Sequence, residues 1–261
     1  MCILCVAIPF VLVTIAPRFI TAAEVNLFFL LETIIGPIWV WLVIKEQPSL
    51  ETIQGGIVII AAIAIHSFMS LKKNELIDTA LQLFYQFGIH AVGINEILTE
   101  SGIAKKTLYN HFKSKDDLII AAIMKRDNNF TTWFKNKLAE APAGEIALLN
   151  VFHGLDHWFK SEVIPLGEFR GCFFLNASAE YKGINADIYE QCKNHKLQIR
   201  ALIYEHVKVI CSSSLDANEL TNTLCILKEG CISTAFVQHD LNSAKTMIPV
   251  ITNLFEQYRD Q

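Results

Sequence analysis

The hydrophobic and polar positions along the chain follow two different patterns, which change near residue 72. Before that point the apolar residues form nearly continuous runs, of which the longest are Val25–Ile44 and Ile53–Leu71. A membrane-crossing helix needs about 20 apolar residues, so both runs have the required length. A third run, Cys2–Ala16, is shorter and contains Pro9. We therefore predict two to three apolar, transmembrane-like helices in residues 1–72.

After Asn74 the apolar residues recur every three or four positions, which is typical of amphipathic helices packed on a core. The members of the first stripe are Leu76, Ile77, Ala80, Leu81, Phe84 and Phe87. Gly88 follows and suits the C-terminus of that helix. Two short helices then fit Ile94–Glu100 and Ala104–His111, with Gly102 supplying a left-handed turn between them.

Longer helices are predicted for the rest of the chain. Ser114-Lys115-Asp116-Asp117 matches a capping box at the start of a fourth helix. The further helices that we expect are Leu118–Leu138, Glu145–Ser161, Phe169–Tyr181, Ala186–Cys211, Asp216–Gln238 and Leu241–Arg259. The sequence therefore predicts an all-α fold in three parts, residues 1–72, 73–120 and 121–261.

Charge singles out the second of these parts. The chain has a net charge of −4, so a nucleic-acid-binding surface must show its positive charge locally. Four lysines fall between Ser101 and Asp116 without an intervening acid. Because the second helix of a helix-turn-helix enters the major groove, this region predicts DNA binding. The candidate contact residues are Lys105, Lys106, Thr107, Tyr109, Asn110, His111 and Lys115.

Residues 74–120 resemble the N-terminal DNA-binding domain of the TetR/AcrR family of bacterial transcription regulators. The matching residues are Ala80-x3-Phe84, Phe87-Gly88, Ile94-x2-Ile97, Ser101-Gly102-Ile103, Lys105-x-Thr107-Leu108-Tyr109-x-His111-Phe112 and Lys115-x2-Leu118. The resemblance implies contacts to bases and phosphates from the start of the recognition helix, and phosphate contacts from Tyr109, His111 and Lys115. Ala104 and Gly93 replace the hydroxyl residues that the family often has there, which removes two backbone contacts.

The C-terminal half resembles the ligand-binding and dimerisation domain of the same family, through Arg170–Ala177 followed by Glu180-Tyr181. The resemblance implies a homodimer formed by the last two helices. Its apolar candidates are Ile226, Ile232, Phe236, Ile248, Ile251, Leu254 and Phe255, although core packing within one chain accounts for them equally well. We also expect a pocket for a small-molecule effector between the central helices. Its candidate residues are Trp158, Phe169, Cys172, Phe173 and Asn176, with Trp133, Phe152 and Phe159 nearby.

Residues 17–66 resemble the C-terminal end of EamA-type drug/metabolite transporters. The matching residues are Ala22-Ala23-Glu24-Val25, Leu30-Leu31-Glu32, Gly36-Pro37-Ile38-Trp39-Val40-Trp41-Leu42, Glu46-Gln47-Pro48 and Gly55-Gly56. These few spans cannot enclose a transport pathway alone. Lys72 and Lys73 place the following residues in the cytoplasm by the positive-inside rule. Two origins stay open: a regulator tethered to the membrane, or translation that starts at Met69.

No catalytic or metal-binding set is predicted. His153 and His157 share a helix face with Asp156 nearby, but a third ligand is not evident. The sequence shows no Ser/His/Asp or Cys/His arrangement, so we expect neither an enzyme nor a cofactor. Seven scattered cysteines indicate a reducing compartment. The resulting hypothesis is a dimeric DNA-binding repressor, cytoplasmic or membrane-tethered, that binds a double-stranded operator and is released by an effector. The alternative is a transporter fragment with an accessory soluble domain.

Overall fold

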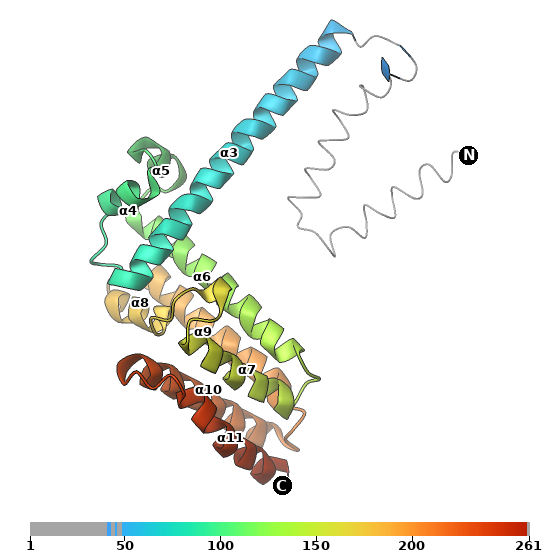
Figure 1. Ribbon diagram of the computed structural model, residues 1–261, viewed down its shortest axis with the longest axis vertical. Coiled ribbons are helices and arrows are strands. Elements are labelled where there is room, and N and C mark those ends of the chain that lie inside the picture. The colour runs from blue at the N-terminus through green and yellow to red at the C-terminus, as the bar shows by residue number, and fades with distance from the viewer. Residues whose placement is uncertain (1–40, 43–44, 46–48, 260–261) are drawn as a thin grey trace. The chain divides into compact units, whose positions relative to one another are not determined.

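A computed structural model describes residues 41, 42, 45 and 49–259, and the chain divides into two units between Ser70 and Leu71. The predicted runs Cys2–Ala16 and Val25–Ile44 lie outside the described residues, apart from Trp41 and Leu42. Every regular element within the described part of the chain is a helix (Figure 1). The predicted all-α class is confirmed there.

The helices follow one another with short connections. Their bounds are α3 (Leu50–Phe87), α4 (Ile94–Ser101), α5 (Lys105–His111), α6 (Lys115–Ala139), α7 (Glu145–Phe159), the 3-10 turn η2 (Ile164–Leu166), α8 (Phe173–Tyr181), α9 (Ala186–Val207), α10 (Ser214–Val237) and α11 (Ser243–Arg259).

Helix α3 corrects the expected break at the junction of the two sequence patterns. The apolar run Ile53–Leu71 and the amphipathic stripe after Asn74 belong to one helix of 38 residues. Nothing between Leu71 and Asn74 breaks a helix, and Lys72 forms an i,i+3 ion pair with Glu75 at 2.8 Å. By length and composition alone, Ile53–Phe87 is the one described helix that qualifies as a membrane span. The first residues of α3 are exposed, which is consistent with an apolar partner or environment.

Short helices α4 and α5 are fixed by one buried residue each, Ile97 and Leu108. Gly102 ends α4 with φ of 65°, the left-handed conformation that the sequence predicted. Ser114 and Asp117 form the expected reciprocal capping box at the start of α6. Local sequence chemistry therefore determines the helix-turn-helix, and Leu108 anchors its second helix to the core.

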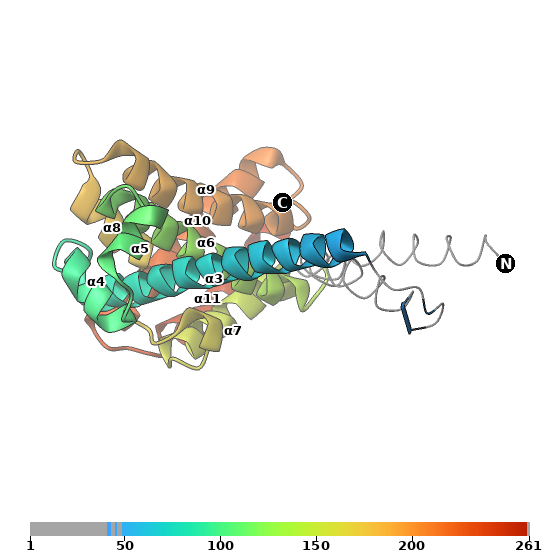
Figure 2. The same ribbon diagram turned by 90° about the horizontal axis from the view of Figure 1, so that it is seen from above.

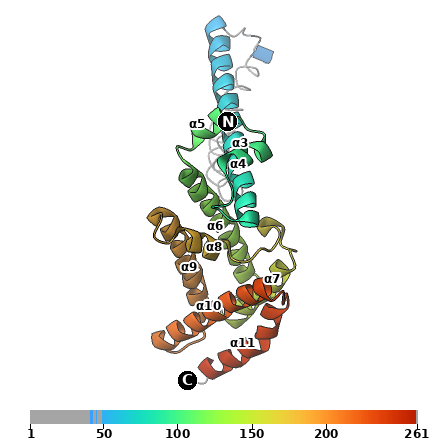
Figure 3. The same ribbon diagram turned by 90° about the vertical axis from the view of Figure 1, so that its left-hand side faces the viewer.

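The longer helices form a bundle with a single core. Helix α6 packs against α7 and α9, and α9 lies beside α8 and α10 (Figure 2). Helices α10 and α11 lie side by side and α11 also packs on α7 (Figure 3). All buried apolar side chains of the described chain fall between Leu76 and Phe255, so the unit Leu71–Gln261 contains its own core.

Three details differ from the sequence-based expectation. Helix α9 ends at Val207, four residues before the predicted Cys211. Helix α8 begins at Phe173 and not at Phe169, because Gly167 and Gly171 adopt positive φ values and Cys172 caps the helix. Phe87, predicted on the inner stripe of α3, is 54% exposed, and Leu83 occupies the core instead. The inner face of the helix is therefore rotated slightly from the predicted one.

Candidate functional site

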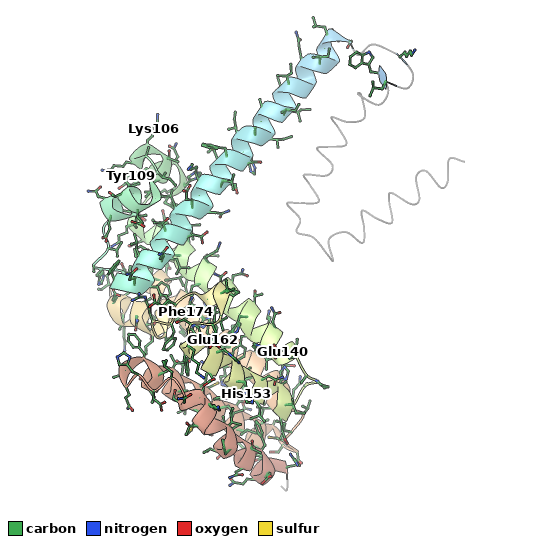
Figure 4. All side chains as sticks on the ribbon, in the orientation of Figure 1. Lys106, Tyr109, Glu140, His153, Glu162 and Phe174 are labelled. Atoms are coloured by element: carbon green, nitrogen blue, oxygen red, sulfur yellow. The ribbon has the colours of Figure 1, made fainter. Side chains whose placement is uncertain are left out.

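The outer surface of α5 carries most of the predicted DNA contacts. Lys105, Lys106, Tyr109 and Asn110 are exposed, and we call this set the α5 lysine face. Figure 4 shows Lys106 and Tyr109 on the outer side of α5. Thr107 and His111 are half-buried, and Leu108 on the opposite side has no exposed surface. The buried leucine therefore turns the two lysines outward.

The helix starts on either side of the turn lack side-chain caps. Gly93 before α4 and Ala104 before α5 make no side-chain cap hydrogen bond. Neither residue has a side-chain hydroxyl that could cap its helix, and the expected loss of two contacts to DNA stays a prediction. The turn itself is held by Ser101, whose hydroxyl oxygen accepts a hydrogen bond from the amide of Ile103 at 3.3 Å.

Lys115 has a different environment from the other predicted contacts. Its ammonium donates to the carbonyl oxygen of Ile89 at 2.8 Å and lies 5.8 Å from the ring centre of Phe84. Burial lowers the pKa of Lys115, with opposing contributions from Glu180 and Asp116. The side chain that the sequence assigned to a phosphate is thus directed toward the α3–α4 connection.

Both ends of α8 are tied to the helix-turn-helix segment. At its N-terminal end, the Tyr85 hydroxyl donates to the carbonyl oxygen of Gly171 at 2.8 Å and accepts from the amide of Arg170 at 2.9 Å. At its C-terminal end, the Glu180 carboxylate accepts from the amides of Ile89 and His90 at 3.1 and 2.6 Å. A shift of α8 would therefore act directly on the connection between α3 and α4.

An open groove of about 880 Å³ lies among α8, α9 and α10, and we call it the α8–α10 groove. Its outer walls carry exposed apolar side chains, namely Leu175, Leu197, Ile226, Phe236 and Val237. Its floor is formed by Cys172, Lys196, Lys228 and Glu229. The volume falls in the range of about 300–1,000 Å³ that is usual for small-molecule sites.

The predicted effector residues divide between this groove and the core. Cys172 and Asn176 line the groove. Trp158 and Phe173 are almost fully buried and, with Cys172, line a much smaller inner space behind the groove floor. Phe169 lines neither space, because its ring packs against Trp158 and Phe159 with centres 4.9 Å apart. Trp158, Phe169 and Phe173 therefore contribute mainly to the core.

The predicted dimer residues also divide. Ile232, Ile251 and Phe255 are buried within one chain, so their assignment to an interface is wrong. Ile226 and Phe236 stay exposed at 72% and 46%, and both line the α8–α10 groove. Ile248 and Leu254 are half-buried against the core. Core packing within one chain therefore accounts for Ile232, Ile251 and Phe255.

The two histidines of α7 do not belong to a larger ligand cluster. His157 Nδ1 lies 2.6 Å from Glu162 Oε2, and Figure 4 marks His153 and Glu162. Among residues 49–259, no group of three or more His, Cys, Asp or Glu side chains is placed to hold a metal ion.

Residues 76–122 match the family model described as bacterial regulatory proteins, tetR family. The crystal structure of SCO4454, a TetR-family transcriptional regulator from Streptomyces coelicolor, shares 26% sequence identity with this chain. It matches with a TM-score of 0.65 over 72% of this chain and 90% of that one. The chain is therefore similar to TetR-family regulators, in residues 76–122 by sequence and over most of the helical unit by fold.

Curated relatives agree with this assignment over shorter segments. The HTH-type transcriptional repressor ComR of Escherichia coli is 27% identical over 132 residues, which are 50% of this chain and 61% of ComR. The regulator YerO of Bacillus subtilis is 44% identical over 54 residues, 21% of this chain and 19% of YerO. The chain thus spans less than two thirds of the length of these relatives.

All seven predicted DNA-contact residues lie inside the segment that the TetR-family model matches. The structure brings six of them together on α5, whereas Lys115 opens α6. Sequence reasoning missed Tyr85 and Glu180 as links to α8, and Lys196, Lys228 and Glu229 as floor residues. Their helical spacing resembles that of ordinary surface and core positions, so the sequence offered little signal.

Proposed function

We propose that the TetR-family unit is a transcriptional repressor that binds a near-palindromic, double-stranded DNA operator as a homodimer. The α5 lysine face supports this best, because it presents two lysines beside Tyr109 and Asn110 on a short helix anchored by Leu108. Such a helix inserts into the major groove, with half-sites about one helical turn apart. Lys105, Lys106, Thr107, Tyr109, Asn110 and His111 are the proposed contacts, and Lys115, which bonds to the carbonyl oxygen of Ile89, holds the start of α6 beside them.

The local electrostatics favour a phosphate backbone. Neither α5 nor the residue before it carries an acid, and no described carboxylate is in ion-pair distance of Lys105 or Lys106. The Lys105 ammonium lies 6.0 Å from the ring centre of Tyr109, which keeps it near the outer face. Binding to phosphates would release counterions, so affinity is expected to fall steeply with salt.

Effector release is proposed to pass through α8. The α8–α10 groove is lined by Cys172, Leu175 and Asn176 of this segment, and the two ends of α8 hold Tyr85 and the amide of Ile89. A ligand in the groove that favours another position of α8 would change the orientation of the helix-turn-helix. The population would shift toward a spacing that no longer matches both half-sites.

The test is selection of an operator from a random duplex DNA pool, using the full chain in lipid nanodiscs. We expect enrichment of a near-palindrome and a linear fall of log affinity with log salt concentration. Tyr109→Ala or Lys105→Ala should weaken binding without a change in melting temperature. Tyr189→Ala and Lys193→Ala on α9 are matched controls and should bind normally. Failure to enrich any sequence, or a salt-independent affinity, would contradict the proposal.

We also propose that residues 1–72, where translated, attach the regulator to a membrane. Support comes from the exposed apolar residues at the start of α3, among them Leu50, Ile57 and Val58. The transporter-fragment alternative predicts the same location but no DNA binding. An immunoblot of fractionated cells with an antibody to the C-terminal half separates the possibilities. A full-length band in the membrane pellet supports attachment, whereas a shorter soluble band indicates a start near Met69.

A further inference from the structure

The small inner space behind the groove floor lies inside the helix bundle, and we call it the inner cavity. Its volume is about 10 Å³, which is room for about one water-sized atom. Its lining includes no carboxylate among the described residues. The polar and charged side chains that line it are Arg126, Trp158, Cys172, His195, Lys196 and Lys228. The inner cavity is therefore surrounded mainly by hydrogen-bond donors.

Two of these donors have fewer acceptors than their burial requires. Arg126 is only 4% exposed and donates to the carbonyl oxygen of Leu166 at 2.6 Å, but no described carboxylate forms an ion pair with it. The indole N–H of Trp158 is buried and has no hydrogen-bond partner in the described part of the chain. Buried donors are rarely left unpaired in folded proteins. Both groups are therefore suited to one more acceptor in the inner cavity.

Cys172 is the lining residue whose sulfur lies closest to a positive charge. The Lys196 ammonium donates to Cys172 Sγ at 3.2 Å, and the Leu175 amide donates to the same sulfur at 3.4 Å as the N-terminal cap of α8. Burial opposes the charge of Lys196, but Cys172 and Glu229 outweigh it and raise its pKa. An ammonium and a helix N-terminus together stabilise the thiolate, which is the nucleophilic form of cysteine.

The other described cysteines lie in a different environment. Burial raises the pKa of the thiols of Cys192, Cys211, Cys225 and Cys231. Among the described hydrogen bonds, none joins a lysine or arginine to these four sulfur atoms, and the Cys231 thiol donates to a backbone carbonyl oxygen. Such thiols react slowly. The contact with Lys196 therefore distinguishes Cys172 from the rest.

We propose that Cys172 is an oxidation site for peroxides and that the inner cavity holds the oxygen atom that it gains. The thiolate sulfur attacks one oxygen of the peroxide, so that an S–O bond forms and the O–O bond breaks. The leaving hydroxide takes a proton from solvent and becomes water. The same electron pair oxidises the sulfur and reduces the peroxide, and the product is a sulfenic acid. Its ionised oxygen accepts hydrogen bonds from Arg126 and Trp158.

The size and position of the inner cavity select this chemistry. One oxygen atom fits a space of this volume, whereas the larger group left by an alkylating agent does not. Cys172 belongs to the start of α8 and keeps 8% of its surface exposed. A small, uncharged peroxide needs only this access. Oxidation therefore leaves the outward faces of α10 and α11 available for the proposed homodimer.

Oxidation of Cys172 is connected to the helix-turn-helix through its neighbour. The Gly171 carbonyl oxygen accepts from the Tyr85 hydroxyl of α3 at 2.8 Å. An oxygen on the sulfur disturbs its contact with the Leu175 amide, so the first turn of α8 and Gly171 shift together. We therefore expect oxidation to weaken operator binding. This consequence rests on the proposed repressor function, whereas the oxidation itself does not.

The test exposes the full chain in lipid nanodiscs to hydrogen peroxide. Samples taken over time are unfolded in dimedone, which traps sulfenic acids, and tryptic peptides are analysed by mass spectrometry. Trypsin cleaves after Arg170 and Lys182, so Cys172 is the only cysteine of its peptide. We expect Cys172 to be trapped at least about tenfold faster than Cys211, which is no less exposed.

Three variants separate the contributions to this reaction. Lys196→Met should slow the trapping of Cys172 about tenfold, whereas Lys196→Arg keeps the charge and should retain most of the rate. Trp158→Phe keeps the ring without the N–H and should lower the amount of trapped sulfenic acid severalfold. Lys193→Met removes an exposed charge of the same helix and is the matched control, with no change expected.

The outcomes separate this inference from the proposed function. Equal trapping of Cys172 and Cys211, or an unchanged rate in Lys196→Met, would overturn the oxidation site. Peroxide should weaken operator binding about tenfold, and should have no effect on the binding of Cys172→Ala. Oxidation of Cys172 without any loss of affinity would overturn the link to DNA. An untreated chain that binds no operator contradicts the proposed repressor, whereas operator binding with an unreactive Cys172 contradicts only this inference.

Discussion

Two groups of lysines in this chain have the same side-chain chemistry but differ in exposure and in their acidic partners. Lys105 and Lys106 are exposed on a seven-residue helix and have no described acidic partner. Lys196 and Lys228 lie under the apolar walls of a groove and share the Glu229 carboxylate. The first group is open to any polyanion that approaches. In the second group, Lys228 is almost fully buried and Lys196 is about one third exposed.

The comparison shows that surroundings decide what a lysine is suited to recognise. Exposed charges act in a high dielectric, where salt screens them and many weak phosphate contacts add up. Partly buried charges act in a lower dielectric, where each contact is stronger but a missing partner costs more. The first arrangement suits a long, regular DNA backbone. The second suits a single buried anion.

The largest expected effect comes from removing the exposed pair. The Lys105→Ala/Lys106→Ala double variant should lower operator affinity about 100-fold, because each lysine contributes about 1–3 kcal/mol when it reaches a phosphate or base. The log–log salt slope should become shallower by about 2, near 0.9 for each lost phosphate contact. A gel-shift titration at several salt concentrations measures both quantities.

The control for this variant removes the same two charges elsewhere. Lys193→Ala/Lys208→Ala deletes exposed lysines of α9 and its C-terminus, each of which forms an ion pair with a glutamate three residues earlier. Its affinity and salt slope should equal those of the unmodified chain. If both double variants behave alike, net charge and not the α5 lysine face governs binding.

The next effect concerns Glu229 and the pH dependence of the free energy of unfolding. The pKa of Glu229 is lowered from its ordinary value of 4.5 to about 2, so its ionised form is favoured in the folded state. That stabilisation is complete above pH 4.5 and is lost as the pH falls toward 2. Because the carboxylate is about one third exposed, we expect about 1–2 kcal/mol after solvent screening.

Glu229→Gln should therefore lower the free energy of unfolding by about 1–2 kcal/mol at pH 7 and flatten its decline in acid. Thermal unfolding followed by near-ultraviolet circular dichroism between pH 7 and 3 measures this. Glu190→Gln, which breaks an exposed i,i+3 pair with Lys193, is the control and should cost less than about 0.5 kcal/mol. Identical curves for the two variants would show that the shared carboxylate adds no stability.

The helix-turn-helix was predictable because its determinants are local in sequence. Gly102 marks a left-handed turn, Ser114 and Asp117 mark a helix start, and Leu108 marks the inner side of α5. Each signal depends on a few neighbouring residues. The bounds of α4 and the turn were therefore correct to within one residue.

The groove was not predictable in the same way. Its floor joins Cys172, Lys196 and Lys228, which are separated by 24 and 32 residues along the chain. Only the packing of α8, α9 and α10 brings them together, and pairing between distant positions leaves no periodic signal. Trp158 and Phe173, which were chosen for the pocket, are almost fully buried, because aromatic residues at this helical spacing satisfy the same pattern as core residues.

The smallest expected effect separates two neighbouring lysines, Lys113 and Lys115. Lys113 is exposed, whereas the Lys115 ammonium donates to the carbonyl oxygen of Ile89. Lys115→Met should therefore lower the free energy of unfolding by about 1 kcal/mol through the lost hydrogen bond. Lys113→Met should leave stability within about 0.5 kcal/mol of the unmodified chain.

Operator affinity is expected to separate the same two variants. Lys113→Met removes an exposed charge beside the α5 lysine face, so the salt slope should become shallower by about 0.9 if that charge meets a phosphate. Lys115→Met removes a charge already bonded to Ile89, so its salt slope should stay unchanged. Thermal unfolding and salt-dependent gel shifts on both variants check the pair. A shallower slope for Lys115→Met would mean that this lysine leaves Ile89 to contact DNA, as the family resemblance implied. Lys115 would then belong with the exposed DNA-binding lysines Lys105 and Lys106.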